Sequence, residues 1–235
     1  MPTTKTARNV ILVGGDKGGV GKSATSRALT EYLDENSSPH IAFDGDDVNP
    51  TFLRFYPKAE RIFTKSVKGF EVLINNLEAE TPTQLVDLGA GTSLMFAQFA
   101  HKTDFLDEAA QAGAAVTFVF VLSPSVDSIH LLKILFEQYG ERLRYVIAKS
   151  EALPGNWDLW ASSKTREALL KANAVEITIP ALDADAFALA DRYSLSWDAA
   201  GQDTRLPLAS RSYLKRWRKQ VFSEFDQAAS FLLLS

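Results

Sequence analysis

A glycine-rich turn between a strand and a helix constrains this chain most. The segment NVILVGGDKGGVGKSATSRAL (residues 9–29) passes from an aliphatic run, through a turn that ends in Gly21-Lys22-Ser23, into a helical pattern. Glycine lets backbone N–H groups curl around an oxyanion, and the new helix adds the positive end of its dipole. A strand, a turn and a helix in this order predict an α/β fold with a phosphate-binding loop.

The polar residues at the end of this turn indicate which phosphate compound is bound. In a loop of this kind the lysine bridges the β- and γ-phosphates of a nucleoside triphosphate, and the next hydroxyl ligates Mg²⁺. These positions are Lys22 and Ser23, so we expect ATP and Mg²⁺ as cofactors. The residues expected to surround the phosphates are Asp16, Lys17, Gly18, Gly19, Val20, Gly21, Lys22, Ser23 and Ala24.

The rest of the chain alternates short apolar, β-branched runs with helical patterns. This alternation predicts a doubly wound, mostly parallel sheet with helices on both faces. Without repeats or a linker, we expect one P-loop domain over residues 1–235. The expected strands are residues 9–13, 40–44, 84–88, 114–122, 143–148 and 175–179. The expected helices are residues 23–34, 68–77, 93–111, 127–139, 162–172, 183–191 and about 210–234.

Two of the expected strands end in carboxylates. IAFDGDDVNPTF (residues 41–52) places Asp44 and Asp46 after the second strand, and QLVDLGAGTS (residues 84–93) places Asp87 before Gly89. The carboxyl ends of parallel strands meet at one edge of the sheet, where open α/β folds bind their ligands. We therefore expect these residues beside the phosphate loop.

The loop departs from the usual pattern, because Asp16 stands where an ordinary P-loop has its first glycine. The run Lys17-Gly18-Gly19-Val20-Gly21-Lys22-Ser23 resembles the deviant Walker A motif of ParA/MinD ATPases. The resemblance covers roughly residues 9–200 and implies an ATP hydrolase that forms an ATP-dependent sandwich homodimer. It implies that Lys17 reaches the partner subunit's phosphates and adds positive charge there, as an arginine finger does.

The same resemblance assigns roles to the carboxylates. It implies that Asp46 orients or activates the attacking water and that Asp44 supports the Mg²⁺ and P-loop end, as a catalytic and metal-site residue. The family's later asparagine corresponds to Asn49, and Asp47 stands where relatives often have proline. The resemblance also implies that Ser23, Asp44 and Asp87 bind the metal. It implies further that Gly89, in a switch II loop, senses the γ-phosphate through its N–H.

Base recognition matches the family less well. Where the family usually has an adenine-reading asparagine, this chain has Lys149, whose aliphatic stem would cover the ring. Residues 148–151 (AKSE) resemble a guanine reader with Glu151 as acceptor, so GTP is the alternative to ATP. By resemblance, the loop beginning at Pro180 forms the other wall of the base pocket.

Composition excludes several classes of protein. The chain has no Cys, which rules out disulfides, thiolate metal sites and cysteine-ligated Fe–S clusters and fits a cytoplasmic protein. The net charge of −4 is uneven, since residues 205–235 carry +4 and the preceding residues −8. Such an asymmetry marks a candidate docking surface for an anionic partner.

The basic segment coincides with the last expected helix. An apolar stripe recurs there at helical spacing, and the basic residues fall mostly off it. The stripe consists of Leu214, Trp217, Val221, Phe225, Ala228 and Leu232. Three interpretations are open: a helix packed on the sheet with a solvated basic face, a surface for non-specific DNA, and, less favoured, a membrane-surface helix. The candidate DNA-binding residues are Lys215, Arg216, Arg218 and Lys219.

Three functional classes follow. The first is a ParA-like ATPase in plasmid stability, partition, positioning or conjugative transfer, similar to the StbB and TraL types, with a DNA-binding adaptor or transfer-complex protein as partner. The second is a MinD-like membrane-associated positioning ATPase. The third is a small-molecule ligase on the same fold, against which Lys17 argues because it has no evident small-molecule role.

Overall fold

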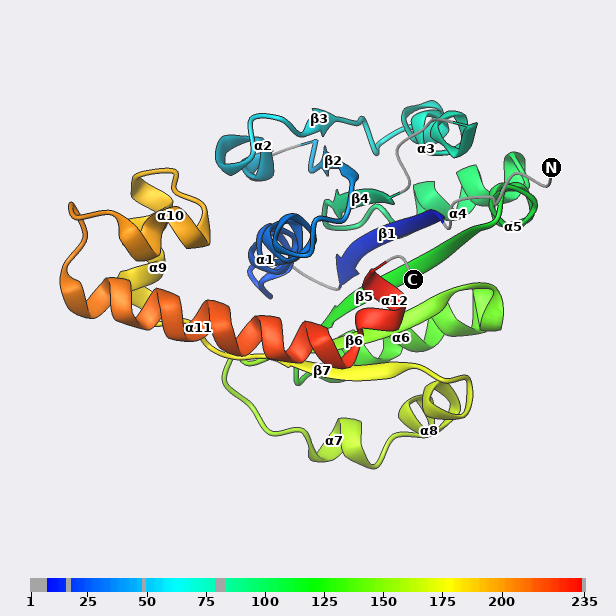
Figure 1. The fold of residues 1–235 in the computed structure, drawn as a ribbon. Helices are drawn as coiled ribbons and strands as arrows, with labels where there is room; N and C mark the ends of the chain where they lie inside the picture. Colours follow the sequence, from blue (N-terminus) through cyan, green and yellow to red (C-terminus); the bar gives the residue numbers. More distant parts are fainter. Residues whose placement is uncertain (1–7, 16–17, 48–49, 79–82, 234–235) are drawn as a thin grey trace.

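A seven-stranded sheet forms the centre of the protein in a computed structural model that describes residues 8–15, 18–47, 50–78 and 83–233. Every strand pairing among these residues is parallel, and the order is β3-β2-β4-β1-β5-β6-β7 (Figure 1). This confirms the predicted fold class. The strands are β1 (Arg8–Gly15), β2 (His40–Gly45), β3 (Glu60–Arg61), β4 (Thr83–Leu88), β5 (Ala114–Leu122), β6 (Arg144–Ser150) and β7 (Val175–Ile179).

Helices cover both faces of the sheet and create two apolar cores. The covered strands are therefore almost continuously buried, as β4 and β5 are. One face is covered by α1 (Lys22–Glu35), α9 (Ala184–Arg192), α10 (Trp197–Gln202), α11 (Leu208–Gln227) and α12 (Ala229–Leu232). The other is covered by α3 (Glu71–Asn75), α4 (Ser93–Lys102), α5 (Phe105–Gln111), α6 (Val126–Tyr139), α7 (Asp158–Ala161) and α8 (Lys164–Lys171).

Three expected helices are interrupted. The helix expected over residues 93–111 divides at Asp104, whose left-handed backbone (φ 49°) separates α4 from α5. Across this break the rings of Phe99 and Phe105 pack with their centres 5.1 Å apart. The helix expected over residues 68–77 divides into a 3₁₀ turn (Val67–Phe70), α3 and a second 3₁₀ turn (Asn76–Glu78). The helix expected over residues 162–172 is present without interruption as α8, which Ser163 caps by accepting the Arg166 N–H, and the short helix α7 precedes it. The last helix ends at Gln227, and α12 follows.

Short elements escaped the sequence analysis. They span two to six residues each and are the helices α2 (Thr51–Phe55) and α10, the strand β3 and the 3₁₀ turn Gly140–Arg142. Such elements are too short to show a helical or strand period, so no pattern predicted them.

The helix α1 is buried over residues 25–33 and contains an unusual buried arginine. Arg27 is 2% exposed, and its guanidinium lies 3.4 Å from the ring centre of Phe55 and 3.7 Å from that of Trp197. It also donates a hydrogen bond to the Leu195 carbonyl. Burial lowers the pKa of Arg27 to about 10, which still leaves it charged at neutral pH. This stack joins α1 to α2 and α10.

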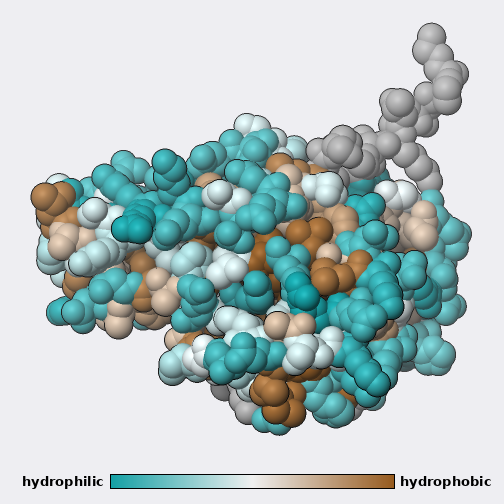
Figure 2. Space-filling view, turned by 90° about the horizontal axis from the view of Figure 1, so that it is seen from below, coloured by the Kyte–Doolittle hydropathy of each residue, from teal (hydrophilic) through white to brown (hydrophobic). Residues whose placement is uncertain are grey.

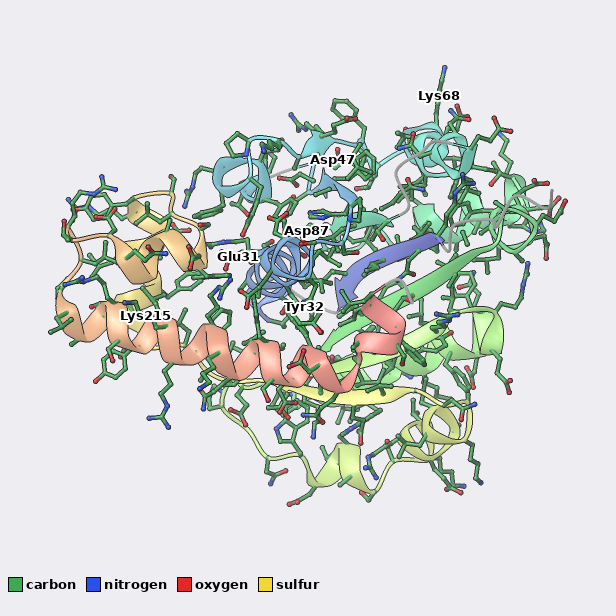
Figure 3. All side chains as sticks on the ribbon, viewed as in Figure 1. Glu31, Tyr32, Asp47, Lys68, Asp87 and Lys215 are labelled. Atoms are coloured by element: carbon green, nitrogen blue, oxygen red, sulfur yellow. The ribbon has the colours of Figure 1, made fainter. Side chains whose placement is uncertain are left out.

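An ion pair joins α1 to α11. Figure 3 shows Glu31 and Tyr32 on α1, alongside α11. The Glu31 carboxylate accepts from Arg218 at 2.7 Å, and also from the Tyr56 hydroxyl and the Asp198 N–H. Arg218 donates to Glu35 as well. Arg218, predicted as a DNA contact, therefore belongs to the helix packing, because it neutralises a carboxylate that is only 7% exposed.

The C-terminal helices confirm the predicted apolar stripe. Leu214, Trp217, Val221, Phe225, Ala228 and Leu232 are all buried. The Phe231 carbonyl accepts from Asn9 and Thr117, which fastens α12 to β1 and β5. The face seen from below is mostly hydrophilic, with separate apolar patches (Figure 2). In the described part of the chain, no helix has the length and apolarity needed to cross a membrane.

Removing Arg218 should destabilise the fold, because Glu31 is buried and would lose its counter-ion. Arg218→Ala leaves a carboxylate without its counter-ion, and we expect the free energy of unfolding to fall by about 3 kcal/mol, as when one partner of a buried pair is removed. Adding Glu31→Gln should restore most of this loss. Urea denaturation measures both, with Arg216→Ala on the exposed face of α11 as the control. If Arg218→Ala matches that control, the ion pair does not stabilise the fold.

Candidate nucleotide-binding site

A cavity of about 580 Å³ lies at the carboxyl edge of the sheet. This volume falls within the range of small-molecule sites. One end is formed by the glycine-rich loop, and the other by an apolar wall from β7, α9 and α11. Its lining residues are Gly18, Gly19, Gly21, Lys22, Ser23, Ala24, Asp46, Thr51, Leu88, Ala90, Ser150, Ala152, Ile179, Pro180, Ala181, Leu182, Ala184, Phe187 and Trp217.

The glycine-rich loop leads directly into α1. Gly21 is the residue that precedes the helix, and its φ of 96° is a left-handed conformation that favours glycine. Gly21 has no side chain that could cap α1, and the beginning of this helix lies at the phosphate end of the cavity, where its dipole favours an anion. Lys22 is 8% exposed and lines the same end. Val20 is buried in the core below the loop.

Asp87 lies beneath the loop. Its carboxylate accepts a hydrogen bond from Ser26 at 2.7 Å and another from Ser23. Burial raises the pKa of Asp87 to about 7; the neighbouring Asp44 raises it further, whereas the two serines and Lys22 act in the opposite direction. A buried carboxylate bonded to the loop's hydroxyl fits the donor set for Mg²⁺, which keeps several waters and takes one or two protein oxygens.

Asp44 and Asp87 are directly opposite each other on β2 and β4, but their carboxylates have different hydrogen-bond partners. Asp44 is completely buried, and its two carboxylate oxygens accept the backbone N–H groups of Asp46 and Leu53, both at 3.0 Å. Burial raises its pKa. Through these two hydrogen bonds Asp44 braces the loop that carries Asp46, and its part in the metal site stays a prediction.

Asp46 lines the cavity, and its neighbour Asp47 fixes the loop from the other side. The Asp47 carboxylate accepts the Lys65 N–H at 2.7 Å and the Thr64 hydroxyl at 3.3 Å. Thr64 also donates to the Gly45 carbonyl. The loop after β2 is therefore held between Asp44 and the segment after β3, with Asp46 facing the cavity.

Gly89 allows the loop after β4 to approach Asp46 closely. A Cβ added to Gly89 would lie 3.0 Å from the Gly45 carbonyl oxygen and 3.1 Å from the Asp46 Cα. Gly89, Asp46 and Asp47 also line a smaller hollow of about 260 Å³. The predicted switch residue thus lies beside the predicted catalytic carboxylate.

The two residues predicted for the base pocket, Lys149 and Pro180, lie differently relative to the cavity. Pro180 and Ser150 are among its lining residues, whereas Lys149 is not. Successive side chains on a strand point to opposite faces, so Lys149 points to the face of the sheet opposite to that of Ser150. Base contacts by Lys149 and Pro180 stay predictions.

The sequence analysis missed several lining residues, among them Thr51, Ser150, Phe187 and Trp217. Trp217 was placed in the apolar stripe of the last helix, which is where it lies, but nothing in that pattern distinguishes a pocket wall from the core. Asp16, Lys17 and Asn49 lie outside the described residues. Lys215, Arg216 and Lys219 are exposed on α11.

The fold is the parallel, helix-covered α/β architecture of ParA- and MinD-like P-loop proteins, with a cavity at the carboxyl edge of its sheet. No family model matches the chain. Protein MobD of Acidithiobacillus ferrooxidans is 25% identical over 219 residues, which cover 92% of this chain and 95% of MobD.

Solved structures share the fold at lower identity. A ParA family ATPase from Chlorobium tepidum is 13% identical, with a TM-score of 0.50 over 91% of this chain and 98% of that protein. A nucleotide-binding protein from Archaeoglobus fulgidus in complex with ADP is 15% identical, with a TM-score of 0.50 over 82% and 88% of the two chains.

Replacing Asp87 by Asn should stabilise the nucleotide-free protein at pH 8. The pKa of Asp87 rises from 3.8 to about 7 on folding, so the folded state binds a proton that the unfolded state releases. The free energy of unfolding of the wild type therefore falls between about pH 4 and 7 and stays lower above this range. The uncharged amide avoids this loss. We expect the variant to melt several degrees higher at pH 8, with a smaller difference at pH 5.

Thermal melting at both pH values measures this difference. Asp158→Asn, which changes an exposed carboxylate, is the control. The same Asp87 variant should bind ATP less tightly when Mg²⁺ is present. A melting difference between wild type and Asp87→Asn that does not change with pH would contradict the assignment of a raised pKa to this carboxylate.

Proposed function

We propose that the chain is an ATP hydrolase that forms a homodimer when ATP is bound. The observation that carries this proposal is the cavity at the carboxyl edge, with a phosphate loop at one end and an apolar wall at the other. Lys22 and the first N–H groups of α1 would bind phosphate, and Ser23 and Asp87 would hold Mg²⁺. The metal would neutralise charge on the phosphates.

The reaction requires a group that directs water to the terminal phosphate. Asp46 is suited to this role because it faces the cavity from a loop that Asp44 and Asp47 hold on both sides. We assign Lys17 to the partner subunit's phosphates, on the basis of the resemblance of its loop to the deviant motif. Gly89 would contact the γ-phosphate through its N–H.

For the cellular role we propose plasmid stability, partition, positioning or conjugative transfer, in the cytoplasm, with a DNA-binding adaptor or a transfer-complex protein as partner. The similarity to MobD and to a ParA family ATPase supports this choice. Direct contact with non-specific DNA would use Lys215, Arg216 and Lys219, which are exposed. The MinD-like alternative is less supported, because the apolar stripe of α11 is buried.

ATP with Mg²⁺ should bind at least tenfold tighter than GTP with Mg²⁺, a difference of about 1.4 kcal/mol. The apolar wall at Pro180 and Trp217 and the small side chains of Ala152 and Ala181 leave few polar groups to bind the guanine edge. Titration calorimetry with both nucleotides measures the ratio. Equal or reversed affinities would overturn the choice of ATP and favour the guanine interpretation of residues 148–151.

The two loop lysines should have separable roles. Lys22→Ala should lose nucleotide binding, because Lys22 lines the phosphate end of its own cavity. Lys17→Ala should bind ATP within a few fold of wild type but lose ATP-dependent dimerisation and hydrolysis, because its charge acts at a shared interface.

Light scattering during chromatography, with a slowly hydrolysed ATP analogue, compares wild type with both variants. Phosphate release under the same conditions gives the rate of hydrolysis. If Lys17→Ala dimerises and hydrolyses ATP normally, the sandwich-dimer mechanism is wrong for this protein, which would then be an ordinary P-loop enzyme with an unusual loop.

A further inference from the structure

The C-terminal helix contributes a side chain to the nucleotide cavity. Trp217 is only 4% exposed, and it lines the cavity together with Ile179, Pro180, Leu182 and Phe187. Its indole N–H donates a hydrogen bond of 2.7 Å to the Pro180 carbonyl. The loop after β7 is therefore attached to α11 at the point where that loop forms the wall of the cavity.

A second tryptophan supports the first from behind. Trp197 of α10 is completely buried, and its ring meets that of Trp217 edge-on at 4.9 Å. Its indole N–H donates to the carbonyl of Ala24 at 3.3 Å, and Ala24 belongs to the phosphate end of the cavity. The two indoles thus connect the apolar wall to the beginning of α1.

Arg27 fixes the position of Trp197. The guanidinium lies between Trp197 and Phe55, and Phe55 belongs to α2, whose Leu53 N–H binds Asp44. The side chains of Trp217, Trp197, Arg27 and Phe55 are consequently in contact one after another, from the apolar wall to α2. A side chain held in this way presents a rigid surface, and a rigid wall binds a ligand without losing side-chain entropy.

We propose that Trp217 is the residue that forms and holds the base-binding wall, so that the nucleotide cavity is complete only while α11 is packed on the core. This inference rests on the proposed nucleotide-binding function. It assigns to the C-terminal helix a part in binding the base, while the phosphate loop binds the phosphates. Because linkage is reciprocal, nucleotide binding also favours the packed position of α11.

Inorganic tripolyphosphate separates this role from the role of the phosphate loop, because it carries the phosphates without a base. Trp217→Ala should weaken ATP binding about tenfold or more, the usual effect of removing an aromatic base contact, and change tripolyphosphate binding less than twofold. Trp217→Phe, which keeps a ring but loses the hydrogen bond to Pro180, should weaken ATP binding by a smaller factor. Titration calorimetry measures each affinity.

Trp160→Phe is the matched control, since Trp160 is also a buried tryptophan with a side-chain hydrogen bond, to Glu176 on the other face of the sheet. It should bind both ligands as the wild type does. ATP should change the tryptophan fluorescence of the wild type and of this control, and the change should be largely lost in Trp217→Phe.

The outcomes are distinct. Wild-type ATP affinity in Trp217→Ala and Trp217→Phe would overturn the proposal, as would an equal loss of ATP and tripolyphosphate binding in both variants, which indicates general damage. Should Trp217→Ala not fold, the comparison of Trp217→Phe with Trp160→Phe decides. A wild-type protein that binds neither ligand would refute the proposed function itself.

Discussion

The burial of α1 is the constraint on which the rest of the structure depends. A helix that starts at a phosphate loop must lie against the sheet, and here residues 25–33 are buried although several are polar. A buried polar group is costly unless it is hydrogen-bonded or paired. Ser26 bonds to Asp87 of β4, Arg27 stacks between α2 and α10, and Glu31 pairs with Arg218 of α11. Ser26, Arg27 and Glu31 therefore attach α1 to different neighbouring elements.

The architecture was predictable because its main signals are local. The run at residues 114–122 is apolar enough to indicate a strand buried on both faces, and the turn before Lys22 indicates both a strand and a helix. The interruptions of helices were not predictable in the same way. Asp104 takes a left-handed backbone so that Phe99 and Phe105 enter one core, and a preference of that kind arises from tertiary packing, which a local pattern does not contain.

The sequence predicts the residues of the candidate site well where the chemistry dictates their spacing. It predicts them less well where strand register decides which side chains face the cavity. Lys22, Ser23 and Asp87 gather at one edge because the carboxyl ends of parallel strands meet there. Side chains alternate along a strand, so Ser150 lines the cavity while Lys149, one position before it, points to the other face of the sheet. Trp217 could not be assigned to the site from its spacing, because a pocket wall and a core contact both require a buried apolar residue.

The helical spacing of apolar and basic residues gives α11 one buried apolar face and one exposed basic face. Trp217 and its apolar neighbours point to the core, whereas Lys215, Arg216 and Lys219 are exposed. Arg218 lies between these faces and is neutralised by Glu31 and Glu35, so the basic charge available to a partner is smaller than the sequence suggests and is concentrated on the outer face. An anionic partner bound there would contact the helix whose buried face lines the nucleotide cavity. Partner binding and nucleotide binding would then act on one element, and that is the physical requirement for coupling between two sites.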